Sequence, residues 1–283
     1  MKNTLKLSNY LFGWFFHKSE RFILGISLAI SIIMLFVVNS LYSGNLYEHI
    51  AIEFRTYDLV VDYSGVGIVF FLGLVSLFVS LFIQINGFYT NGKGMYSIFT
   101  LPMKRHEIFF SFFLSAVAAV LLYFAVWLVT MVLLYFPITS MYEKEASKAI
   151  LYISEEVTLN NLNVSITNGL FLAFHRSAFL SACFPVSWIQ ALSLCGGMFL
   201  SITAIVFAGL YNEYVFARVA LFMVVLGGFC AAFYCVWIFI EDQFGYSMKT
   251  VMPQSLYLCG LALFLGIILI FVALGKLKQR KDI

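Results

Sequence analysis

Charged residues are scarce in this sequence. Only 11% of its 283 residues are Asp, Glu, Lys or Arg, and 62% are hydrophobic. A typical soluble domain has about 25% charged residues. One water-soluble core of this size cannot bury so much apolar surface, so the bilayer must solvate the remainder. The net charge of +3 is small and scattered, which argues against a nucleic-acid-binding surface.

Motifs for catalysis and metal binding are also missing. His106-Glu107 lacks the second histidine of a zinc protease motif, and no serine lies in a Gly-x-Ser-x-Gly turn. The cysteines are odd in number, and all but the first fall within predicted membrane helices, so neither a disulfide framework nor a zinc site is expected: Cys183, Cys195, Cys230, Cys235 and Cys259. We therefore expect no enzyme activity and no cofactor in this chain itself.

One apparent nucleotide motif lacks its required context. Gly87 to Lys93 matches G-x-x-x-x-G-K, but Gly94 follows where a P-loop has Ser or Thr. A P-loop also follows a β-strand, whereas this stretch follows a predicted membrane helix. We interpret it as a turn leaving the membrane.

Six long stretches free of charge predict six membrane-spanning helices. A helix needs about 20 apolar residues to cross the hydrocarbon core, and lipid excludes unpaired backbone groups. We therefore predict an all-α integral membrane protein, one permease-like domain over residues 1–283, with a six-helix bundle. The expected spans lie near 22–42, 66–86, 108–136, 187–210, 218–240 and 255–275.

The distribution of Lys and Arg predicts that both chain ends are cytoplasmic. With the N-terminus inside, 12 of the 17 basic residues fall in inner segments and 5 in outer loops. An excess of Lys and Arg marks the cytoplasmic side. We expect a multi-pass protein of the cell membrane.

The segments outside the spans have patterns of their own. In residues 1–20 five apolar residues share one helical face, which predicts a helix in the inner interface, with a disordered start as the alternative: Leu7, Tyr10, Leu11, Trp14 and Phe15. The outer loop 137–186 predicts a small extracytoplasmic cap. Helical spacing around 146–157 and alternation at 161–167 predict one amphipathic helix and some strand, with irregular loops as the alternative.

The inner segment between the second and third spans is amphipathic. Its apolar residues Tyr96, Ile98, Phe99 and Leu101 precede Pro102, which disfavours helix in the residue before it. Glu107 is expected in the first turn of the third span, where the helix dipole favours an acid. Such a segment can lie on the membrane or dock into a groove of a partner.

In this inner segment the chain resembles the permease subunits of type-2 ABC exporters. In that family a short cytoplasmic coupling helix follows the second span, with a glycine, several hydrophobic residues, then Leu-Pro and a basic residue. The matching residues over 94–105 are Gly94, Tyr96, Ile98, Phe99, Leu101, Pro102 and Arg105. Six spans, cytoplasmic ends, an inner interfacial helix and the chain length agree. The acidic-basic residues that often precede the glycine are absent, since Tyr89 to Lys93 stand there.

The resemblance implies a transport subunit with partners. A separate cytoplasmic ABC ATPase, which binds ATP and Mg, would contact segment 94–105, and a second permease, identical or different, would complete the complex. The expected substrate is amphipathic or apolar, such as a peptide, drug or lipid-like molecule. Ser111, Ser115 and Ala119, at four-residue spacing, predict close helix contact, either between two permeases or within one chain.

Two other classes of function remain open. A secondary transporter or channel usually has an ionisable site at membrane depth, and none of the six predicted spans contains a charged residue. A non-transport membrane protein, such as an immunity, sensory or assembly factor, is the third class, because fold does not fix function. No substrate residues follow from the sequence.

Overall fold

The computed structural model describes residues 2–44, 57–90, 103–153, 169–184 and 188–210. All regular elements within these ranges are helices, so the all-α prediction is confirmed for them. The predicted spans 218–240 and 255–275 lie outside the described residues. So do the alternating stretch at 161–167 and most of segment 94–105.

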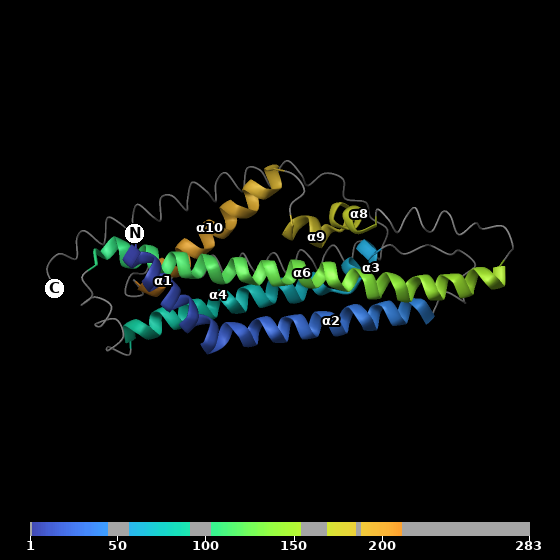
Figure 1. The fold of residues 1–283 in the computed structure, drawn as a ribbon, viewed down its shortest axis with the longest axis horizontal. Coiled ribbons are helices and arrows are strands. Elements are labelled where there is room, and N and C mark those ends of the chain that lie inside the picture. The colour runs from blue at the N-terminus through green and yellow to red at the C-terminus, as the bar shows by residue number, and fades with distance from the viewer. Residues whose placement is uncertain (1, 45–56, 91–102, 154–168, 185–187, 211–283) are drawn as a thin grey trace.

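Four long helices lie in alternating directions and form the bundle (Figure 1). They are α2 (Arg21–Gly44), α4 (Val66–Thr90), α6 (Arg105–Ile153) and α10 (Trp188–Leu210). Three of them contain a stretch long and apolar enough to cross a membrane: Arg21–Ser40, Val66–Phe88 and His106–Met141. In α10 the apolar stretch is the shorter Leu194–Leu210. These helices cover the positions of the first four predicted spans.

The third long helix does not end where the sequence indicated. We expected it to stop near residue 136, before Pro137, but α6 continues through Pro137 to Ile153. A proline inside a helix removes one backbone hydrogen bond. Side-chain hydroxyls bond to carbonyls beside it, with Thr139 Oγ1 donating to the Tyr135 carbonyl at 2.7 Å and Ser140 Oγ to the Pro137 carbonyl at 3.0 Å. Residues 137–153 of the expected outer loop therefore belong to α6.

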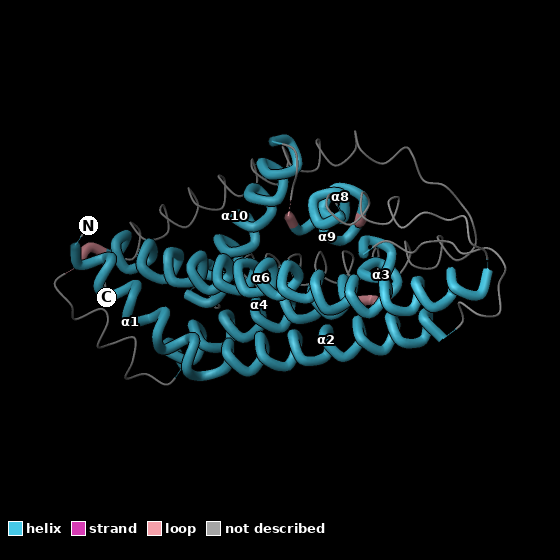
Figure 2. The backbone as a smooth tube through the Cα atoms, turned by 45° about the vertical axis from the view of Figure 1, so that its right-hand side comes forward, coloured by secondary structure: helices cyan, strands magenta, loops and turns pink. Residues whose placement is uncertain are grey.

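Three short helices pack together near the middle of α6, and we call them the cap helices (Figure 2). They are α3 (Tyr57–Tyr63), α8 (Gly169–Arg176) and α9 (Ala178–Cys183). Asp62 of α3 joins them, because its Oδ1 accepts hydrogen bonds from Ser177 Oγ at 2.6 Å and from the Phe179 N–H at 3.3 Å. Ser177 is also the N-cap of α9, accepting from the Leu180 N–H at 3.1 Å.

A glycine turn connects the cap to the bundle. Gly65, between α3 and α4, has φ of +70°, a left-handed conformation that glycine adopts without steric cost. The Tyr57 hydroxyl then fixes α3 to α6 by donating to the Met131 carbonyl at 2.8 Å. Burial, and to a smaller degree the neighbouring Tyr135, raises the pKa of the Tyr57 phenol, so this group remains a donor.

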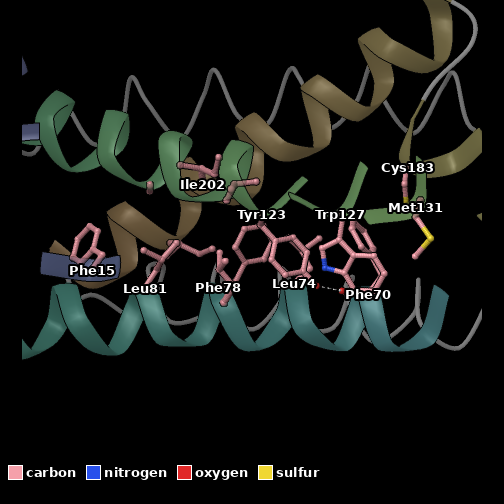
Figure 3. Close-up of a cluster of buried hydrophobic side chains, with 14 of the residues drawn as sticks. Phe15, Phe70, Leu74, Phe78, Leu81, Tyr123, Trp127, Met131, Cys183 and Ile202 are labelled. Carbon is pink, nitrogen blue, oxygen red and sulfur yellow. Dashed lines mark hydrogen bonds between the residues drawn. The ribbon is translucent and has the colours of Figure 1, made fainter. Parts of the chain in front are cut away.

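Aromatic rings dominate the core between α4, α6 and α9 (Figure 3). Phe70 of α4 contacts Tyr123, Trp127 and Phe179, with ring centroids 5.1–5.4 Å apart. The Tyr123 hydroxyl donates to the Phe70 carbonyl at 2.9 Å. We call these four residues the aromatic cluster. Part of the aromatic content of the sequence thus serves packing between helices.

Candidate functional site

The site that the sequence predicts lies at the junction between α4 and α6. α4 ends at Thr90 and α6 begins at Arg105, the last residue of the predicted coupling motif. The other motif residues lie outside the described residues: Gly94, Tyr96, Ile98, Phe99, Leu101 and Pro102. In Figure 1 the end of α4, the start of α6 and α1 (Lys2–Phe15) lie at the same end of the bundle, which we call the junction end.

The N-terminus of α6 is capped by hydrogen bonds between Glu107 and Lys104, and the sequence predicted the position of Glu107. Glu107 is in the first turn, as predicted. Its Oε2 accepts a hydrogen bond from the Lys104 N–H at 3.1 Å, and the Lys104 carbonyl accepts from the Glu107 N–H at 2.8 Å. A Glu three residues into a helix that reaches back to the residue before the helix is half of a capping box. Helix α6 therefore has a defined start directly after segment 94–102.

The N-terminal helix α1 packs against the first turns of α6. Leu11 and Phe15 of α1 are fully buried. Ser115 Oγ donates to the Ser8 carbonyl at 2.9 Å, and Ser111 Oγ lies 3.2 Å from the Thr4 carbonyl. Both α6 serines are completely buried. Helix α1 of the same chain thus packs against the small residues at four-residue spacing on α6.

Helix α1 also reaches α4. Trp14 packs on Phe88, in the last turns of α4, with ring centroids 4.2 Å apart. Phe15 lies 6.5 Å from Phe112 of α6. Tyr10, which the sequence pattern placed on the same face, is instead 64% exposed, because it lies about 100° around the helix axis from the buried Leu11. The amphipathic helix expected in the interface is therefore seated on both helices that border segment 94–102.

A π-helical segment, η1 (Phe16–Glu20), joins α1 to α2. Its Ser19 bonds to α4: Gln84 Nε2 donates to Ser19 Oγ at 2.6 Å and to Ser80 Oγ at 2.9 Å. Ser19 and Ser80 also share a hydrogen bond. Gln84 Oε1 is buried and has no hydrogen-bond partner. We call Ser19, Ser80 and Gln84 the polar triad.

The last residue of η1 is a buried acid. Glu20 is only 3% exposed, and its Oε1 has no hydrogen-bond partner. Burial raises the pKa of this carboxyl to about 7, because desolvation disfavours the charged form. The sequence showed Glu20 only as an acid on the predicted cytoplasmic side, directly before a span. Its burial depends on helices far away in the sequence, so no local pattern marks it.

The described residues offer no metal site, since they contain no group of three or more His, Cys, Asp or Glu side chains. The histidines and cysteines within these ranges do not assemble one: His17, His106, His175, Cys183 and Cys195. At the junction end, one amphipathic helix packs on two long helices.

Comparison with known proteins identifies no relative. No protein-family model, curated protein or solved structure matches this chain.

Proposed function

We propose that this chain is the membrane permease subunit of a type-2 ABC exporter. A separate cytoplasmic ABC ATPase subunit binds Mg and hydrolyses ATP, and this chain couples that hydrolysis to export of an amphipathic or apolar substrate, such as a peptide, drug or lipid-like molecule. The motif from Gly94 to Arg105 supports the proposal by its position between two apolar helices.

The seating of α1 is the observation that carries the proposal. Trp14 rests on Phe88 of α4, and Ser8 accepts a hydrogen bond from Ser115 of α6. The two helices on either side of the coupling segment are thus bridged by a third. A force applied to segment 94–105 reaches α4 and α6 and, through these contacts, α1, because packed interiors transmit strain.

The proposed mechanism is a population shift. The membrane helices have two arrangements, and two ATPase subunits close on ATP. The closed ATPases bind the coupling segments more tightly in one arrangement than in the other. That difference in affinity reorients the spans. In this chain, Phe99, Leu101 and Arg105 are the proposed ATPase contacts, with Phe99 and Leu101 as the apolar part.

A second permease, identical or different, completes the proposed complex in the cell membrane, with both termini in the cytoplasm. The remaining surface meets lipid. One face of α2 suits that environment, because it exposes large apolar side chains along its length: Phe22, Ile26, Ile30, Ile33, Met34 and Val37.

A mild-detergent pull-down of the tagged chain tests the proposal. Wild type is compared with Phe99→Asp plus Leu101→Asp, which places two charges in the apolar part of the coupling segment. The matched control is Phe171→Asp, an exposed phenylalanine on cap helix α8. We expect an ABC ATPase with wild type and with the control, and its loss with the double variant at equal membrane abundance.

The opposite results are equally informative. An ATPase that stays bound to the double variant would show that the contact lies elsewhere. No ATPase with any of the three proteins, in cells that express candidate ATPases, would favour an autonomous protein, either a secondary transporter or channel or a non-transport factor.

A further inference from the structure

Glu20 is a buried acid that no described side chain pairs with. It is the last residue of η1, which contacts α1, α2 and α4, and it is almost fully removed from solvent. The Oε1 atom accepts no hydrogen bond. An ionised carboxylate in such a place is strongly disfavoured unless it is paired, so a buried acid of this kind takes up a proton instead.

The charged groups around Glu20 do not supply that pairing. On α1, Lys6 is exposed, and on η1, His17 is exposed. Arg21 at the start of α2 is exposed too, with its guanidinium over the ring of Phe22 at 5.0 Å. α4 has no charged residue between Val66 and Thr90. Among the described side chains none forms an ion pair with Glu20, and the side chains of Lys2 and Lys18 are not described.

Among the described residues, the contacts that hold the Glu20 segment in place are neutral. The polar triad connects η1 to α4, Trp14 packs on Phe88, and Ser8 accepts from Ser115. η1 itself is a π-helical turn, in which the Arg21 N–H bonds to the Phe16 carbonyl five residues earlier. Such turns are rare and are frequently found at functional sites. A charge on Glu20 therefore opposes this seating directly, and no ionic contact among the described side chains compensates for it.

We propose that Glu20 is a proton-binding site that controls the seating of α1 and η1 on α4 and α6. With the proton on the carboxyl, the acid is neutral and the segment stays packed. When the proton leaves to solvent, the carboxylate is better hydrated outside the bundle, and release of the segment is favoured. The proton is the only species exchanged. This inference does not depend on the chain being an ABC permease.

The sign of the pH effect follows from the direction of the shift. The carboxyl pKa rises from its ordinary 4.5 to about 7 in the seated state. The seated state therefore holds the proton more tightly than the released state, and seating is strongest below pH 4.5. Between pH 4.5 and about 7, each pH unit shifts the equilibrium roughly tenfold toward release, and above that the shift is complete.

Cysteine labelling of the full chain in lipid nanodiscs tests this. Leu11→Cys places a thiol at a position that is fully buried in the seated state, and Tyr10→Cys places one at the exposed neighbouring position. Mass spectrometry of the peptide that contains positions 10 and 11 gives the maleimide labelling rate at each. The ratio of the two rates cancels the pH dependence of the thiol reaction itself. We expect the ratio Leu11→Cys over Tyr10→Cys to rise at least tenfold from pH 5.5 to 8.

Two further substitutions, each added to both cysteine variants, test whether Glu20 causes the rise of the labelling ratio with pH. Glu20→Gln keeps the shape and remains neutral, so the ratio should stay at its low-pH value throughout. His17→Gln removes the exposed imidazole three residues before Glu20, and the rise should persist.

If the labelling ratio does not change with pH when Glu20 is present, the inference is overturned. A rise that persists in Glu20→Gln, or one that disappears in His17→Gln, would overturn it as well. If Glu20→Gln yields no folded protein, Glu20→Leu replaces it as the neutral variant and must give the flat, low ratio. Failure of both neutral variants to fold would also overturn the inference, because the seated state would then require the charge.

Discussion

The two halves of the helical bundle differ in the balance of polar and aromatic contacts between their helices. At the junction end, hydroxyls and an amide join the helices beside ring contacts such as Trp14 on Phe88: Ser8 with Ser115, and the polar triad of Ser19, Ser80 and Gln84. In the half beside the cap helices, rings enclose Phe70 at the centre of the aromatic cluster, and the Tyr123 hydroxyl donates to the Phe70 carbonyl. Each half also leaves a buried group without a partner: Glu20 Oε1 and Gln84 Oε1 in the first, Trp127 Nε1 in the second.

This difference shows which half can rearrange at small cost. Lipid tails are as apolar as the helices, so burial of apolar surface does little to hold membrane helices together, and shape and hydrogen bonds do it instead. A ring enclosed by other rings leaves a cavity when it moves. When two helices separate, a serine hydroxyl loses its acceptor on the neighbouring helix but can still donate to a carbonyl of its own helix, as Ser115 does to Ser111. We therefore expect the aromatic half to be rigid and the junction end to be adjustable.

Truncation of the aromatic cluster should have the largest effect. Trp127→Ala removes a fully buried indole from contact with Phe70, Tyr123 and Phe179. We expect a loss of about 3–5 kcal/mol in the free energy of unfolding, measured by SDS titration in mixed micelles. Trp188→Ala, at a residue that is 92% exposed, should cost little. Equal losses in the two variants would contradict a rigid aromatic core.

Close approach of α4 to α6 gives the next effect. A Cβ added at Gly73 would collide with the Tyr123 hydroxyl and lie 3.1 Å from Ser27 Cβ. Gly73→Ala should therefore destabilise the chain by about 1–3 kcal/mol in the same titration. Gly87→Ala, in the same helix with nothing within 4 Å, should be neutral or slightly stabilising. A neutral result at Gly73 would show that Tyr123 moves aside freely.

The cap helices should respond more weakly. Ser177→Ala removes both the N-cap of α9 and the hydrogen bond to Asp62. The expected loss is about 1 kcal/mol of unfolding free energy. Ser140→Ala serves as the control, since this exposed hydroxyl bonds only to a carbonyl of its own helix. A loss above that of Gly73→Ala would mean that the cap, and not the ring cluster, dominates this half.

The smallest effect is expected at the junction end. Ser115→Ala removes one hydroxyl bond between α6 and α1, and such bonds within membranes are worth about 0.6 kcal/mol. Ser76→Ala, an exposed serine bonded within α4, should cost nothing measurable. The same SDS titration compares the two variants. A cost at Ser115 similar to that at Trp127 would remove the contrast between the halves.

The sequence predicted the described helices better than their contacts. Charge-free windows located α2, α4, α6 and α10 to within a few residues, except for the far end of α6, because bilayer thickness fixes a minimum length for an apolar helix. Hydrophobicity placed the end of the third span near residue 136, but the helix continues, because one lost hydrogen bond at Pro137 is tolerated within a long helix. Helix ends depend on such small differences, and windows do not resolve them.

The site was harder to predict than the fold. The four-residue spacing of Ser111 and Ser115 predicted close contact with another helix. The spacing does not distinguish a helix of another subunit from α1, which is the helix they contact. The seat of α1 depends on Phe88 and Ser80, which lie more than 60 residues along the chain from their partners. The burial of Glu20 arises from the same distant contacts. The coupling motif at 94–102 remains a prediction from the sequence.

The length of α6 determines how far this helix extends beyond the bilayer. Its 49 residues, at about 1.5 Å each, make a rod of roughly 74 Å. A bilayer with its headgroups is about 40–45 Å thick. Even with a tilt of about 20°, common for membrane helices, roughly 25 Å or more of the rod stands clear of the lipid. Anything that meets its free end does so at a standoff from the membrane surface, at the height of a small folded domain.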